Sequence, residues 1–216
     1  MVNKEKFNSN YKSTLKRIAD ICVKYNRNPD EVELLPVTKN HPKEAIVFSQ
    51  KAGSYNVGEN RIQETIDKIN TLGPINIQWE LIGHLQSNKV KLAVTHFDRI
   101  QTVDSFKLVK KLNDSAKNIN KVQRILLQFN AGSDPKKFGA SLESANELME
   151  TALNLDNIKI EGLMTIAPLS DDINVARTTF ANLQNLKSSL EEKFDISLPV
   201  LSMGMSGDLE AAIEMG

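Results

Sequence analysis

Short apolar runs alternate with longer amphipathic stretches along most of the chain. The apolar runs predict strands, and the stretches between them carry apolar residues three and four positions apart, which predicts helices. The predicted strands cover 33–38, 54–57, 78–82, 99–103, 122–129, 158–164 and 199–202. The predicted helices after them cover 43–52, 60–72, 86–94, 105–118, 141–153, 172–193 and 207–215.

One further amphipathic helix is expected before the first strand, over residues 3–26. Its apolar side chains recur at helical spacing, and Asn28 and Pro29 end it. Plausible N-caps of later helices are Asp104, Ser141 and either Asp171 or Asp172.

Seven strand-then-helix units in succession predict a parallel sheet with helices outside it. The sheet is either a closed barrel or an open doubly wound sheet. The first strand lacks a G-x-G-x-x-G motif after it, and the even spacing favours a TIM-type (β/α)8 barrel. The eighth strand is missing from the sequence, which stops after the seventh helix. Without a linker rich in Pro, Gly or Ser, residues 1–216 are expected to form a single domain.

Composition narrows the class of protein. Lys plus Arg and Asp plus Glu both number 27, so a broad basic face for nucleic acid is not expected. The single cysteine, Cys22, excludes an internal disulfide framework and a multi-cysteine metal site, and we expect a buried thiol and no metal. No apolar run approaches the ~20 residues of a membrane span, and the N-terminus lacks an apolar signal core. A cytoplasmic protein without a membrane partner is the default expectation.

Residues at the carboxyl ends of the strands are the candidates for chemistry, because barrels of this type carry their sites there. Lys39 ends the first strand, and its amine could form a Schiff base with an aldehyde, although a solvated lysine is the commoner case. Glu59 and Asn60 follow the second strand and could either cap a helix or contact a ligand. His84 follows the third strand and is, alone, more often a packing residue.

The later loops contain residues that could bind an anion. The loop 130–139 carries Lys136 and Lys137, and it could be simply solvated or attract an anion. Met164, at the end of the sixth strand, is by default a core residue. The run 201–208, Leu-Ser-Met-Gly-Met-Ser-Gly-Asp, lies directly before a helix, where free amides and the Ser206 hydroxyl favour a phosphate. The alternative is an ordinary helix cap by Ser206.

Taken together, these motifs resemble the pyridoxal phosphate homeostasis proteins, also called the YggS-like or proline synthetase co-transcribed family. The resemblance covers about residues 10 to 216. It rests on Pro-Val-Thr-Lys at 36–39, Val-Gly-Glu-Asn-Arg-x-Gln-Glu at 57–64, Leu-Ile-Gly-His-Leu-Gln-Ser-Asn-Lys at 81–89, Glu-Gly-Leu-Met-Thr at 161–165 and the run 201–208.

The resemblance implies a barrel like the N-terminal domain of alanine racemases. It implies a protein that carries or buffers pyridoxal 5'-phosphate, held as a Schiff base on Lys39, with Asn60 beside the cofactor and Ser206 on its phosphate. The cofactor-binding residues expected from the motifs and the strand ends are Lys39, Asn60, Met164, Ser202, Gly204, Met205 and Ser206. The protein is expected to be a monomer, with pyridoxal phosphate and recipient apo-enzymes as its partners.

Two departures from the family pattern stand out. The family usually has Trp-His-Phe-Ile-Gly at the third strand, whereas this sequence has Trp79-Glu80-Leu81-Ile82-Gly83. Family members also continue past the final Gly into a strand bearing an Arg that faces the pyridine nitrogen, and a turn that helps bind phosphate. If the chain ends at Gly216, we expect weaker cofactor binding and an open sheet edge; if a tail follows Gly216, we expect normal cofactor binding.

Two enzyme classes compete with a carrier. A pyridoxal-phosphate-dependent racemase of this fold needs a second base opposite the lysine, which the resemblance places on a tyrosine of an added C-terminal domain. The only tyrosines here are Tyr11, Tyr25 and Tyr55, all in the first half of the chain, so we expect no enzyme. A sugar-phosphate isomerase without cofactor would need a carboxylate base, for which Glu59 is the best candidate.

Overall fold

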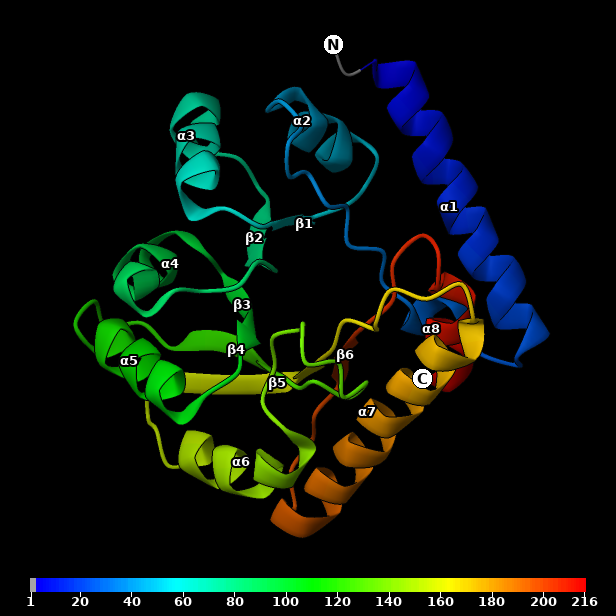
Figure 1. The fold of residues 1–216 in the computed structure, drawn as a ribbon. Coiled ribbons are helices and arrows are strands. Elements are labelled where there is room, and N and C mark those ends of the chain that lie inside the picture. The colour runs from blue at the N-terminus through cyan, green and yellow to red at the C-terminus, as the bar shows by residue number, and fades with distance from the viewer. Residues whose placement is uncertain (1–2) are drawn as a thin grey trace.

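Six parallel strands lie side by side in the order in which they occur along the chain, in the computed structural model, which describes residues 3–216. The sheet curls, with helices around its outside (Figure 1). Strands that are neighbours in sequence are neighbours in space, without the reversal of a doubly wound sheet, which confirms the predicted barrel type. The strands are β1 (Asn56–Glu59), β2 (Gln78–Leu81), β3 (Arg99–Val103), β4 (Gln123–Gln128), β5 (Ile158–Met164) and β6 (Val200–Ser202).

The helices lie close to their predicted ranges. Asp172 caps α7 as expected, whereas Ser105 rather than Asp104 caps α5, and Ser141 caps the short 3-10 turn before α6. The helices are α1 (Lys4–Lys24), α2 (Glu44–Lys51), α3 (Ile62–Leu72), α4 (Val90–His96), α5 (Phe106–Lys117), α6 (Ala145–Leu153), α7 (Ile173–Phe194) and α8 (Leu209–Met215). Three 3-10 turns cover Pro29–Glu31, Ser87–Lys89 and Leu142–Ser144.

The prediction of a regular first strand over residues 33–38 is wrong. Only Val37 forms a bridge, parallel to Gly58 of β1. The Gly58 amide donates to the Pro36 carbonyl at 2.8 Å, and the Thr38 amide donates to the Gly58 carbonyl at 3.0 Å. Pro36 has no N–H to give, and within residues 3–216 the segment has no hydrogen-bonded neighbour on its other side. The segment nevertheless occupies the first strand position and places Lys39 at its carboxyl end.

The predicted second strand is also displaced. Residues 54–57 were expected to form it, and β1 instead begins at Asn56 and continues to Glu59. Glu59 belongs to the strand because it pairs with Leu81 of β2, and it is buried like the rest of β1. Counting the segment at Val37, residues 3–216 contain seven strand positions and no eighth.

The main hydrophobic core lies between the outer face of the sheet and the helices. Alternate side chains of β1 to β4, such as Val57, Leu81, Ile100 and Ile125, are buried there. A smaller cluster joins α1 to α8, and it includes Cys22, which is fully buried as expected. The first and last helices therefore pack side by side (Figure 1).

Charged side chains fill the inside of the sheet near the amino ends of the strands. Arg99 of β3 donates two hydrogen bonds to Glu80 of β2 and lies 3.3 Å from Glu161 of β5. Arg124 of β4 donates to the other oxygen of Glu161 at 2.8 Å. This network links four strands and leaves the carboxyl ends of the strands for a site.

Candidate functional site

The sequence-predicted residues lie at one end of the barrel, because the carboxyl ends of parallel strands share an edge. Lys39 follows the segment at Val37, and Asn60 directly follows β1. Met164 is the last residue of β5, and Ser202 is the last residue of β6. The loop 203–208 continues from Ser202 to α8.

Lys39 occupies a central position of a tight turn. The His41 amide donates to the Thr38 carbonyl at 3.1 Å, and Asn40 takes a positive φ of 59°, which asparagine tolerates. The Lys39 side chain is exposed, and the structure gives it no hydrogen bond or ion pair with any residue from 3 to 216. A lysine whose backbone is held in a turn and whose amine has no protein partner can react with an external carbonyl.

Asn60 presents an unsatisfied polar atom. Its Oδ1 is buried without a hydrogen-bond partner among the described residues. Its backbone lies against Gly83, where a Cβ would meet the Asn60 carbonyl oxygen at 2.1 Å, so only glycine fits. Thr102 donates to the Gly83 carbonyl at 2.8 Å and fixes this contact from β3. A buried acceptor without a partner is expensive, and a bound ligand is one way to satisfy it.

The ends of β5 and β6 differ in character. Met164 is buried and supplies an apolar surface. The Ser202 hydroxyl donates to Gln101, whose amide in turn donates to Glu80. The Ser202 proton is therefore directed into the charged network inside the sheet, and in this conformation it is not free for an anion.

The loop 203–208 offers free backbone donors. The amides of Gly204, Ser206 and Gly207 have no hydrogen-bond partner within residues 3–216. The Met205 amide donates to the Asp208 carboxylate, which lies at the N-cap of α8 without capping the helix. The N-cap residue of α8 is therefore Asp208, and the alternative that Ser206 is an ordinary helix cap is wrong. Gly204 adopts a φ of 85° that a side chain would strain.

One positive charge near this loop was not expected from the sequence. Arg17 of α1 donates to the Ser206 carbonyl at 3.0 Å, across 189 positions of sequence. Free amides, a serine hydroxyl and an arginine are donors that suit a phosphate, and the free amine of Lys39 suits the aldehyde of pyridoxal phosphate. The residues present thus fit that cofactor.

His84 and Asp104 end neighbouring strand positions at the same edge. The His84 ring stacks on Phe138 with centroids 3.8 Å apart, and His84 Nδ1 lies 3.7 Å from Asp104 Oδ2. Burial raises the pKa of Asp104 above its ordinary value, while His84 acts in the opposite direction. His84 also lines a cavity of about 590 Å³ together with Asn60 and Arg61.

Glu59, the candidate base of an isomerase, is fully buried. Its Oε1 accepts from Thr38 at 2.6 Å and pairs with Lys68 at 2.7 Å. It therefore holds other side chains and does not project from the barrel end, which argues against the isomerase.

The fold and the site define a class of protein, the barrel of the alanine racemase N-terminal domain. The family model of that name, "Alanine racemase, N-terminal domain", matches residues 14–215. This confirms the predicted fold class.

More specific similarities follow. The chain is 37% identical over 202 residues to a pyridoxal phosphate homeostasis protein of Aquifex aeolicus, covering 94% of this chain and 89% of the relative. It is 39% identical over 197 residues to the protein of that name in Vibrio alginolyticus, covering 89% and 84%. PipY of Synechococcus elongatus PCC7942, solved with PLP bound, superposes with a TM-score of 0.82 at 34% identity, covering 92% and 94%. The chain belongs to the pyridoxal phosphate homeostasis protein family.

Two further kinds of feature are absent from residues 3–216. No helix within residues 3–216 is long and apolar enough to cross a membrane. No group of three or more His, Cys, Asp or Glu side chains in the same range could hold a metal ion.

Proposed function

We propose that this protein binds pyridoxal 5'-phosphate through a Schiff base on Lys39 and carries or buffers the cofactor for other proteins. The observation that supports this most strongly is the pairing of an unpartnered Lys39 amine with a loop of free amides at the same barrel end. The names of the relatives and the PLP bound to PipY agree with it.

Each residue has a defined part in this proposal. The Lys39 nitrogen bonds to the aldehyde carbon, and the aldehyde oxygen leaves as water. The amides of Gly204, Ser206 and Gly207 and the Ser206 hydroxyl bind the phosphate, with Arg17 adding positive charge. The buried Asn60 Oδ1 lies beside the cofactor, and the Met164 side chain provides apolar contact.

A carrier differs from an enzyme in what the residues around the cofactor must do. Bound pyridoxal phosphate supplies an electron sink, but turnover also requires groups that move protons. A carrier needs only reversible capture, since water hydrolyses the Schiff base and frees the cofactor for a recipient apo-enzyme. We propose the carrier, with any amino-acid chemistry slow.

Borohydride reduction tests the assignment of Lys39. Reduction of the cofactor-loaded protein followed by peptide mapping should place the pyridoxyl group on Lys39. A label on Lys136 or Lys137 instead contradicts the assignment. Lys39→Ala should abolish the near-ultraviolet or visible band of the Schiff base and leave the unfolding midpoint nearly unchanged, because the side chain is exposed and makes no protein contact.

A further inference from the structure

Lys68 of α3 is buried beneath the turn that carries Lys39. Its side chain is 8% exposed, and its ammonium group has three acceptors. These are the Thr38 carbonyl at 2.9 Å, Glu59 Oε1 at 2.7 Å and Glu64 Oε1 at 2.9 Å. An ammonium group has three N–H donors, so each one is satisfied.

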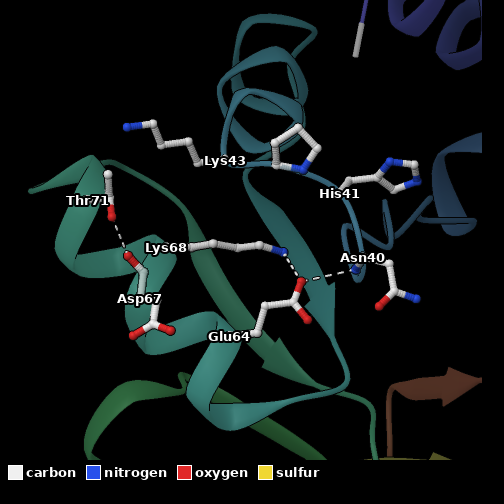
Figure 2. Close-up of a pocket in the computed structure, with 8 residues that line it drawn as sticks. Asn40, His41, Lys43, Glu64, Asp67, Lys68 and Thr71 are labelled. Carbon is white, nitrogen blue, oxygen red and sulfur yellow. Dashed lines mark hydrogen bonds and ion pairs between the residues drawn. The ribbon is translucent and has the colours of Figure 1, made fainter. Parts of the chain in front are cut away.

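The same group of residues holds both neighbours of Lys39. Lys68 binds the carbonyl of Thr38, the residue before it. Glu64, paired with Lys68, accepts the amide of Asn40, the residue after it, at 3.1 Å (Figure 2). The Thr38 hydroxyl also donates to Glu59. The peptide groups on the two sides of Lys39 are thus tied to one ion cluster, whereas the Lys39 side chain is tied to nothing within residues 3–216.

A buried lysine at this position needs an explanation beyond stability. Burying a charged pair costs several kcal/mol of desolvation, and an apolar side chain of similar volume often stabilises a protein as well or better. The hydrogen bond from Lys68 lowers the pKa of Glu64, with burial acting against it, which agrees with an ionised Glu64. What an apolar residue could not do is hold the Thr38 carbonyl and orient Glu64 towards Asn40.

We infer that Lys68 and Glu64 are positioning residues that fix the Lys39 turn so that its amine meets the aldehyde of the cofactor. The inference rests on the proposed function. A fixed attacking group makes covalent capture faster and tighter than a mobile one, because less orientation is lost on reaction. The cluster acts on the covalent bond and leaves the phosphate loop, which belongs to a different strand end, unaffected.

Comparing the affinities for two ligands distinguishes a positioning role of Lys68 from a general effect on protein stability. Pyridoxal 5'-phosphate can form the bond to Lys39, whereas pyridoxine 5'-phosphate has the same ring and phosphate but an alcohol in place of the aldehyde. In Lys68→Met the affinity for pyridoxal 5'-phosphate should fall by about tenfold or more, as expected when charged hydrogen bonds that fix a reacting group are lost. The affinity for pyridoxine 5'-phosphate should stay within about twofold. The rate at which the absorption band of the Schiff base forms should fall together with the affinity for pyridoxal 5'-phosphate.

Glu64→Ala provides a second variant if Lys68→Met does not fold. The Glu64 side chain is 28% exposed, and Lys68 retains its ion pair with Glu59 when the Glu64 carboxylate is removed. This variant frees the Asn40 amide and should reduce the same two quantities, the pyridoxal phosphate affinity and the rate of band formation.

Helix α7 offers a matched control. Lys187 and Glu191 are also four residues apart and 2.7 Å from each other, and Glu191 also accepts a backbone amide, that of Leu198. Lys187→Met and Glu191→Ala should leave both ligand affinities unchanged, even where they lower the urea midpoint.

The outcomes are distinct. Equal losses for the two ligands, or unchanged capture in both cluster variants, overturn the positioning role. If the wild-type protein binds pyridoxine and pyridoxal phosphates equally and yields no pyridoxyl-Lys39 after reduction, the proposed function itself fails. Selective loss of the pyridoxal form in the cluster variants, with the α7 variants normal, supports the inference.

Discussion

Glu80 should contribute more to stability than any exposed charge of this chain. Its side chain is 1% exposed and accepts hydrogen bonds from Asn56, from Gln101 and twice from Arg99. In Glu80→Gln one oxygen becomes an NH2 group that faces these donors, and buried Arg99 keeps only Glu161, at 3.3 Å, as an ionised partner. Breaking a buried ion pair on one side costs about 3–5 kcal/mol. For a protein of this size that corresponds to a fall in Tm of roughly 6–20 °C.

Urea unfolding followed by circular dichroism at neutral pH measures the loss. Asp20→Asn is the control, because Asp20 and Lys16 form an ion pair of 2.6 Å whose side chains are 64% and 76% exposed. That substitution should cost less than about 1 kcal/mol. The double variant Glu80→Leu/Arg99→Leu should recover most of the loss, since it leaves no unpaired charge at these two positions. A free energy of unfolding for Glu80→Gln that matches Asp20→Asn would refute the reasoning.

Two further predictions concern the phosphate loop and acid stability. Ser206→Ala should weaken pyridoxal phosphate binding by about 1–2 kcal/mol in a titration, and unchanged affinity would remove the hydroxyl from the site. Burial would raise the pKa of Glu161, but hydrogen bonds from Arg124 and Lys159 hold it below the ordinary value of 4.5. Its stabilisation is therefore complete above that value and is lost as the pH falls through the lower folded pKa. Urea midpoints across this acid range should fall less steeply in Glu161→Gln than in wild type.

The periodic pattern of apolar residues predicted most of the fold, because buried residues recur at different spacings in the strands and the helices of a barrel. Residues 99–103 and 158–164 form strands at the predicted bounds. The segment 33–38 has the apolar pattern of a strand but lacks regular pairing, since pairing depends on neighbours that a local pattern does not show. The shift of β1 has a similar cause, because Glu59 is polar in sequence and buried in the fold through Lys68.

The site was only partly predictable for the same reason. Strand-end residues such as Lys39 and Ser206 could be found because topology gathers them at one edge. Arg17 could not, since it reaches the loop from α1. Lys68 could not either, because its burial depends on contacts between α3 and Glu59 of β1. Glu80 stands where the family usually has a histidine, and only the structure shows that its carboxylate is the centre of a buried network.

The distribution of proton-carrying groups leads to a last prediction, about turnover. Tyr25 donates its hydroxyl hydrogen to Glu210 of α8, and Tyr11 lies on α1. Tyr55 lies before β1, at the opposite end of the strands from Lys39. None of them follows the carboxyl end of a strand, where the cofactor is proposed to lie. At that end His84 is stacked on a phenylalanine and lies close to Asp104, which makes it a candidate for a second base.

Deuterium exchange at the α-carbon of alanine distinguishes the two functions. The loaded protein in D2O should exchange this proton slowly, with little inversion, because one lysine returns the deuteron to the face from which it removed the proton. His84→Phe preserves the stacking on Phe138 and removes the imidazole, and it should leave the slow rate unchanged. Rapid exchange with inversion that disappears in His84→Phe would make this protein a racemase, with His84 as the base that the tyrosines do not provide.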